Sequence, residues 1–256
     1  MTGFQFLFIG AVRSADLRRR FFVDAFDAGR AVLVGDAAHH LGRVLRAEPG
    51  QLYELSDGTS VWLGKIEFAA KDEIQFSLVE PLPVRTSSLD KTLLLAVVKF
   101  DAFEWALEKA TELAVNRIVP LAAARSEKGL LTAAGKRSER WKKILFESSQ
   151  QSRRVRLPVI EPVMTPREAF AAANSQLRLL LSERADAPSL RKLLTGRSAD
   201  SVAMAIGPEG GWTDEELAAA TKRGFEAASL GNLILRTETA VTACLASVNY
   251  ALDAIS

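Results

Sequence analysis

The sequence contains almost no cysteine or histidine. Its 256 residues include one cysteine, Cys244, and two histidines, the adjacent His39 and His40. A single cysteine excludes an internal disulfide framework. Structural zinc sites take four ligands, mostly Cys and His, which is more than this sequence supplies. We therefore expect a protein without a metal.

Long hydrophobic runs are also missing. No apolar stretch approaches the roughly 20 residues that a membrane-spanning helix needs. The N-terminal "MTGFQFLFIGAV" has no basic segment before its apolar run, which favours a strand or an overextended start over a signal peptide. We expect a cytoplasmic protein with no membrane partner.

The formal net charge is only +2, but the charges are unevenly distributed. Residues 136–156 contain eight Lys or Arg and two Glu. Such a patch suits phosphate contacts, although the solvated face of an ordinary helix gives the same pattern.

Two hydrophobic patterns divide the chain. Residues 51–79 alternate between apolar and polar side chains around Asp57-Gly58, which predicts hairpins and, with "RRFFVD" and "AVLVG", a small β-barrel over residues 1–82. After a segment rich in Pro and Ser, continuous apolar strands alternate with helices from residue 90 to residue 256. That alternation predicts an α/β domain with a parallel sheet.

The loop "AIGPEGGWTDEE", residues 205–216, matches neither the P-loop nor the dinucleotide-binding glycine pattern. Thr213 and Glu216 predict a capping box, so carboxylates of the protein itself already occupy the positive end of the helix dipole. With Glu209 also in the loop, a cationic ligand such as S-adenosylmethionine fits better than a phosphate. A tight turn that binds nothing would need the same glycines.

A second loop, "SLGNLILRTETA", residues 229–240, has a similar arrangement. Gly231-Asn232 and an apolar step precede Arg236, Thr237 and Glu238, which open the final helix. Thr237 is the predicted N-cap of that helix. Two such loops at strand ends predict a pocket at the carboxyl edge of the sheet.

These two loops, together with "RRFFVD", "HHLGRVLRA", "FEWALEKATELAV" and "ERWKKILFESSQQSRR", resemble the RsmE family of 16S rRNA (uracil-N3) methyltransferases in the SPOUT superfamily. The match covers nearly the whole chain in order and leaves out only the first seventeen or so residues. It implies a PUA-like β-barrel RNA-binding domain over residues 1–82, and a SPOUT α/β methyltransferase domain over residues 90–256 with a C-terminal trefoil knot. It also implies a homodimer that acts on uridine 1498 of 16S rRNA within the 30S subunit.

The resemblance also assigns site residues. Those expected to bind S-adenosylmethionine lie in three segments: Leu181, Ser182, Gly207, Pro208, Glu209, Gly210, Gly211, Leu230, Gly231, Asn232, Leu235, Arg236, Thr237 and Ala240. N3 of uracil must lose a proton, so Glu238 and Glu209 are candidate bases and Arg236 is a candidate for stabilising the developing negative charge. For RNA phosphates we expect Arg19, Arg20, Arg43 and Arg46 in the barrel, and Arg153 and Arg154 in the second domain.

The chain departs from the family pattern at three places. Leu233 stands where family members commonly have Arg, Ala114 where they have Gly, and Ala102 where they have another Arg. Roles held by those arginines do not transfer to this chain.

Two other functions are compatible with the residues. A catalytically silent RNA-binding protein would share the basic patch, but it would not need the two glycine loops. A SPOUT enzyme that acts on tRNA would share the loops and differ in its substrate.

Overall fold

The structure, a computed structural model, describes residues 19–84 and 86–253. The chain forms two compact units, residues 1–84 and 85–256. The apolar N-terminal run and its predicted strand lie outside the described residues. None of the described helices is both long enough and apolar enough to cross a membrane.

The first unit is a five-stranded sheet in the order β1-β3-β4-β5-β2. Strands β3, β4, β5 and β2 pair antiparallel in turn, and β1 is parallel to β3. The elements are β1 (Arg20–Phe22), β2 (Arg30–Val34), α1 (Gly35–His39), the π-helical turn η2 (His40–Val44), β3 (Leu52–Ser56), β4 (Val61–Ala69) and β5 (Glu73–Pro81).

The predicted hairpin at Asp57-Gly58 is confirmed. It joins β3 to β4, where Asp57 Oδ1 accepts hydrogen bonds from the backbone N–H groups of Thr59 and Ser60, both at 2.8 Å. Gly58 has φ +87°, a conformation that glycine adopts without steric penalty.

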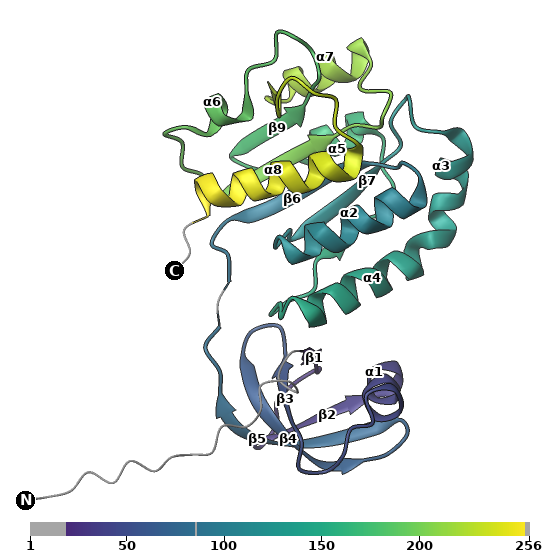
Figure 1. Cartoon of the computed structure of the whole chain (residues 1–256), viewed down its shortest axis with the longest axis vertical. Helices are drawn as coiled ribbons and strands as arrows, with labels where there is room; N and C mark the ends of the chain where they lie inside the picture. Colours follow the sequence, from purple (N-terminus) through teal and green to yellow (C-terminus); the bar gives the residue numbers. More distant parts are fainter. Residues whose placement is uncertain (1–18, 85, 254–256) are drawn as a thin grey trace, which may run out of the picture. The chain divides into compact units, whose positions relative to one another are not determined.

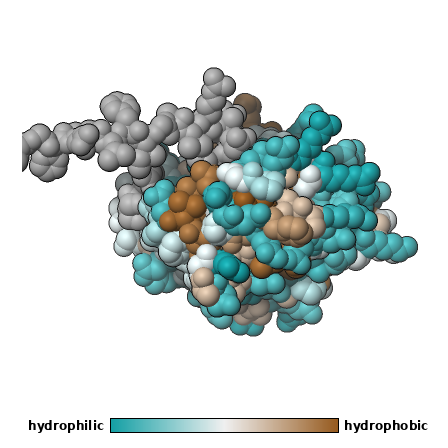
Figure 2. Space-filling model, turned by 90° about the horizontal axis from the view of Figure 1, so that it is seen from below, coloured by the Kyte–Doolittle hydropathy of each residue, from teal (hydrophilic) through white to brown (hydrophobic). Residues whose placement is uncertain are grey.

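Strand alternation sends one set of side chains into the core of the first unit. Phe21, Leu55, Ile66 and Ile74 are completely buried there. On the opposite face, Val32 of β2 and Phe68 of β4 are both about half exposed and both stand opposite Gln75 of β5. Figure 2 shows hydrophobic surface among hydrophilic surface on the face that it presents.

The second unit is a six-stranded, entirely parallel sheet in the order β11-β9-β10-β6-β7-β8. Helices connect its strands (Figure 1). The elements are β6 (Asp90–Ala96), α2 (Phe100–Glu112), β7 (Arg117–Leu121), α3 (Lys128–Ala134), the 3₁₀ turn η3 (Gly135–Arg137), α4 (Ser138–Gln151), β8 (Val159–Ile160), α5 (Pro166–Ala172), β9 (Leu177–Leu181), α6 (Leu190–Leu194), β10 (Ser201–Ile206), α7 (Asp214–Lys222), β11 (Glu226–Ala228) and α8 (Thr237–Leu252).

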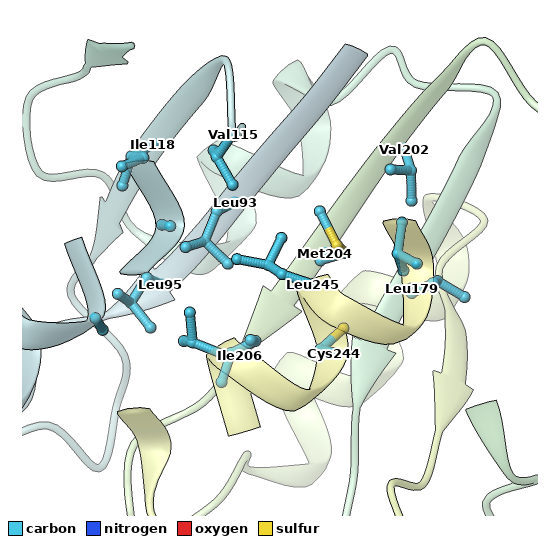
Figure 3. Packing of buried hydrophobic residues seen from close by; sticks show 14 of the residues in the cluster. Leu93, Leu95, Val115, Ile118, Leu179, Val202, Met204, Ile206, Cys244 and Leu245 are labelled. Carbon is cyan, nitrogen blue, oxygen red and sulfur yellow. The ribbon is translucent and has the colours of Figure 1, made fainter. Parts of the chain in front are cut away.

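Both faces of this sheet are covered, as the continuous apolar strands predicted. Leu93 and Leu95 belong to one buried layer with residues of α2, α4, α6 and α8, while Leu94 and Ala96 belong to the other with residues of α5 and α7. Figure 3 shows the first layer, in which Leu245 of α8 lies among side chains of the strands. The predicted α/β fold is therefore confirmed, and the trefoil knot stays a prediction.

Three short elements were not predicted from the sequence: α3, α6 and β11. None is long enough to produce a convincing apolar period. One of the apolar strands expected after residue 90 is the segment "LPVIEPV", residues 157–163. It forms only the two-residue strand β8, which lies between Pro158 and Pro162. Proline has no N–H to contribute to a strand ladder.

A buried ion pair joins the start of β6 to the end of α8. The Lys91 ammonium is fully buried and lies 2.9 Å from Asp253 Oδ2, and it also donates to Asn249 Oδ1 at 2.7 Å and Ser87 Oγ at 3.0 Å. Burial lowers the pKa of Lys91, and the carboxylate of Asp253 opposes that effect. The pair holds α8 across the sheet that it covers.

Ala114 follows α2 with φ +64°. This is the left-handed conformation that glycine usually adopts after a helix, and in an L-residue it costs about 1–2 kcal/mol. The departure from glycine at this position therefore leaves strain in the backbone.

We expect Ala114→Gly to stabilise the protein by about 1 kcal/mol, because relief of the left-handed strain exceeds the entropy gained by the unfolded chain. Thermal unfolding would measure the change. The control is Ala218→Gly at an exposed position of α7, which should destabilise by about 1 kcal/mol through lost helix propensity. Equal destabilisation by both substitutions would show that Ala114 is not strained.

Candidate functional site

Strands β9, β10 and β11 are neighbours in the parallel sheet, so the loops that follow them meet at one edge. They surround a cavity of about 500 Å³. Thirteen of the predicted cofactor-binding residues line it: Leu181, Ser182, Gly207, Pro208, Glu209, Gly210, Gly211, Leu230, Gly231, Asn232, Leu235, Thr237 and Ala240. Arg236 is not among the lining residues.

Side-chain hydrogen bonds tie these loops together. The Trp212 indole N–H donates to the Leu181 carbonyl at the end of β9 at 2.9 Å, and the Thr237 hydroxyl donates to the Gly207 carbonyl at 3.3 Å. From the loop after β7, Arg125 Nη1 donates to the Gly210 carbonyl at 2.7 Å. The cavity wall is therefore held in place by the protein's own bonds.

The capping box predicted at α7 is confirmed. Thr213 Oγ1 accepts from the backbone N–H of Glu216 at 3.2 Å, and Glu216 Oε2 accepts from the backbone N–H of Thr213 at 2.9 Å. The other carboxylate oxygen of Glu216 accepts from the backbone N–H of Ala124 at 2.8 Å, so this cap also connects the glycine loop to the loop after β7.

The cap predicted at Thr237 is wrong. Arg236 occupies the N-cap position of α8 without a side-chain cap bond, and Thr237 is the first helical residue. The Thr237 hydroxyl donates instead to the Gly207 carbonyl, on another loop of the cavity wall. The pattern of residue types could not reveal this competing partner, because Gly207 is thirty positions away in sequence.

The rim of the cavity is more acidic than basic. Glu183, Glu209 and Asp214 line it, as do Arg125 and Arg184. Arg184 forms an ion pair with Asp214. This pair leaves two carboxylates, Glu183 and Glu209, against the single cation Arg125. The remaining negative charge favours a cationic or neutral ligand over a phosphate.

A second hollow, of about 730 Å³, contains all three predicted catalytic side chains. Its lining residues are Lys99, Asp101, Ala102, Trp105, Glu209, Arg236, Glu238 and Thr239. Glu209 also lines the first cavity. The two hollows therefore adjoin, and Arg236 and Glu238 stand on the second one only.

The six arginines predicted to bind RNA fall into two groups. Arg19, Arg43, Arg46 and Arg153 are exposed. Arg20 is buried and donates to Glu54 Oε2 from Nε at 3.1 Å and from Nη2 at 2.8 Å.

Arg154 donates to the Thr111 carbonyl at 2.9 Å and to the Arg156 carbonyl at 3.0 Å, and burial lowers its pKa to about 10. These bonds give Arg20 and Arg154 a structural role, and their phosphate contacts stay predictions.

The sequence interpretation missed several lining residues, above all Arg125, Trp105 and Lys99. They lie 80 or more positions before the glycine loop in sequence. The segment "FEWALEKATELAV" contains Trp105, but nothing in that segment indicates contact with the glycine loop. Within residues 19–84 and 86–253, no group of His, Cys, Asp and Glu side chains is arranged to hold a metal ion.

The chain is similar to known RNA methyltransferases in sequence. A family model described as an RNA methyltransferase domain matches residues 85–249, and one described as an RNA methyltransferase PUA domain matches residues 33–79. A Synechocystis protein named ribosomal RNA small subunit methyltransferase E is 34% identical over 220 residues, which cover 84% of this chain and 71% of the relative. The chain belongs to the RsmE family.

Two solved structures are similar to this chain in fold as well as in sequence. One is a ribosomal RNA small subunit methyltransferase E from Neisseria gonorrhoeae, and the other is a methyltransferase from Legionella pneumophila; both contain S-adenosylmethionine. Each is 29% identical to this chain, with a TM-score of 0.82, and each match covers 92% of this chain and 98% of the solved one. The RsmE fold therefore extends over both units.

Gly207 provides a test of the cavity wall. A Cβ atom there would lie 3.0 Å from Cε2 of Trp212, whose buried ring packs against Phe170. Gly207→Ala should therefore destabilise the protein by about 1–3 kcal/mol through overpacking. Denaturant unfolding measures the change.

Gly135→Ala is the matched control, because Gly135 has a helical backbone and nothing within 4 Å of the added Cβ. It should be neutral or slightly stabilising. If the two variants unfold at the same denaturant concentration, the packing of Trp212 on Gly207 does not constrain the loop.

Proposed function

We propose that the protein transfers the methyl group of S-adenosylmethionine to N3 of a uridine in the 16S rRNA of the small ribosomal subunit. The observation that carries this proposal is the pair of adjoining hollows that share Glu209. One is lined by the predicted cofactor-binding residues, and the other by the predicted catalytic residues. The names and bound ligands of the RsmE relatives support it.

The first cavity suits S-adenosylmethionine in size, shape and charge. Ile206, Leu230 and Leu235 offer apolar contacts for a purine and ribose, and the backbone of residues 207–211 and 229–235 offers hydrogen bonds. Glu183 and Glu209 are exposed carboxylates at the rim, where they favour a sulfonium charge. When bound, S-adenosylmethionine supplies an electrophilic methyl group.

The second hollow suits the target base. N3 of uracil is a weakly acidic imide, so its proton must leave before or during transfer. Glu209 and Glu238 are the carboxylates placed to accept that proton. Arg236 is exposed at the same hollow, where its guanidinium can donate to the oxygen or nitrogen that becomes negative. The loop hydrogen bonds at Gly207 and Gly210 fix the backbone from which these side chains extend, and such positioning is the orientation component of catalysis.

A homodimer completes the proposal. Leu233 and Ile234 are about four-fifths exposed at the edge of the cofactor cavity, and two large apolar side chains in that position favour coverage by a second copy. The exposed arginines of the barrel would contact rRNA phosphates within the 30S subunit. The protein would act in the cytoplasm, with the trefoil knot forming the cofactor loops.

The decisive experiment is transfer of labelled methyl from S-adenosylmethionine to purified 30S subunits, free 16S rRNA and tRNA, followed by mapping of the modified nucleoside. The proposal requires N3-methyluridine in the small-subunit rRNA. Label only in tRNA would assign the chain to a different RNA substrate, and binding of 30S subunits without transfer would assign a purely RNA-binding role.

Arg236→Ala should lower the single-turnover rate of 30S methylation by about 10² or more, because one preorganised donor to the transition state is lost. S-adenosylmethionine affinity, measured by calorimetry, should change much less. Arg167→Ala, which removes an exposed arginine of α5 away from both hollows, serves as the control and should leave the rate unchanged. A near-normal rate for Arg236→Ala would give Arg236 a structural role only.

Affinity for 30S subunits should fall with salt, with a log–log slope of roughly −0.7 to −0.9 for each phosphate neutralised. Replacing the exposed Arg43 and Arg46 of the first unit with Gln should make that slope shallower by the contribution of one or two phosphate contacts. Cofactor affinity should stay the same. A slope that does not change in the double variant would place the RNA contacts elsewhere.

A further inference from the structure

Trp105 is the large apolar residue that α2 leaves exposed. Phe103, Ala106 and Leu107 of the same helix are completely buried in the core, whereas Trp105 is 42% exposed. A Trp with 42% of its surface exposed gives up a large part of the stabilisation that full burial would provide. Its ring lies at the hollow that contains Arg236 and Glu238.

The neighbours of Trp105 along α2 cover only part of its side chain, which is 42% exposed. Asp101 and Ala102 precede it by one helical turn and line the same hollow, and Ala102 is too small to cover an indole. Lys109, one turn later, has its ammonium 5.6 Å from the ring centroid. Glu108 and Glu112 bind that ammonium at 2.8 and 2.9 Å, so Lys109 supports the ring from the C-terminal side.

Trp105 also lines another hollow, of about 510 Å³, in which two arginines and three carboxylates lie. The charged residues are Arg137, Arg140, Asp101, Glu104 and Glu108. Buried Glu104 holds both guanidinium groups, at 3.3 and 2.7 Å, and Arg137 also stacks over the Phe100 ring at 4.5 Å. Both arginine side chains remain substantially exposed, so they are positioned to meet phosphates on a strand that passes Trp105.

We propose that Trp105 is the stacking surface for the target base: the unstacked uracil enters the Arg236 hollow and stacks on the exposed part of the indole, while Arg137 and Arg140 contact the flanking phosphates. A base must leave its stack before an enzyme can act on it, and an aromatic ring replaces part of the lost stacking. This assignment rests on the proposed function, since it identifies the substrate contact of the same site.

The test compares Trp105→Phe, which keeps an aromatic face, with Trp105→Leu, which keeps an apolar side chain without one. Trp105→Leu should weaken binding of 30S subunits and slow subsaturating single-turnover methylation by about tenfold or more, the scale of one lost base–aromatic stack. Trp105→Phe should stay within about threefold of the parent. Affinity for S-adenosylmethionine and the oligomeric mass should be the same in all three proteins.

Three results would overturn the assignment. Parental binding by Trp105→Leu would show that no base stacks there, and a Trp105→Phe variant as weak as Trp105→Leu would show that the aromatic face is not what matters. A lower oligomeric mass for Trp105→Leu would show that a second copy of the chain covers the ring. Should the parent protein bind 30S subunits without transferring methyl, the proposed reaction would fail, and the binding constants alone would still decide the role of Trp105.

Discussion

The parallel arrangement of the six-stranded sheet is the constraint on which the site depends. Because β9, β10 and β11 are neighbours that run in the same direction, the loops at their carboxyl ends must meet at one edge. Trp212 and Thr237 then hydrogen-bond across this edge to carbonyl groups of neighbouring loops. The helix α8 starts directly at this edge, so packing of its apolar side on the strands also positions Arg236 and Glu238.

The packing of α8 is secured at both of its ends. Val241, Cys244, Leu245 and Val248 are completely buried against the sheet and α2. Burial raises the pKa of the Cys244 thiol to about 12, so this cysteine is a core residue rather than a nucleophile. At the far end, the buried Lys91–Asp253 pair connects the helix terminus to β6. A shift of the helix end would separate Lys91 from Asp253 and leave a buried charge without its partner. The free-energy cost of that separation opposes the shift.

The glycine loop precedes a helix whose N-terminus carries the protein's own negative charges. A helix N-terminus ordinarily attracts an anion. In this chain Asp214, Glu215 and Glu216 fill the first turn of α7, and Glu216 caps it. The loop therefore keeps a close-packed glycine turn while offering no site to a phosphate. Exposed arginines lie in the first unit, at Arg43 and Arg46, and beside Trp105, at Arg137 and Arg140.

The sequence by itself determined what depends on neighbouring residues. The alternation of residues 51–79, the Asp57-Gly58 hairpin, the apolar strands and the Thr213 capping box are all local patterns, and each predicted its element correctly. Tertiary structure decided what depends on contacts between distant segments. It diverted the Thr237 hydroxyl to Gly207, buried Arg20 against Glu54, and brought Trp105 to the same hollow as Arg236. Such contacts depend on how strands and helices stack in space, and residues 30 to 131 positions apart carry no local signal of their proximity.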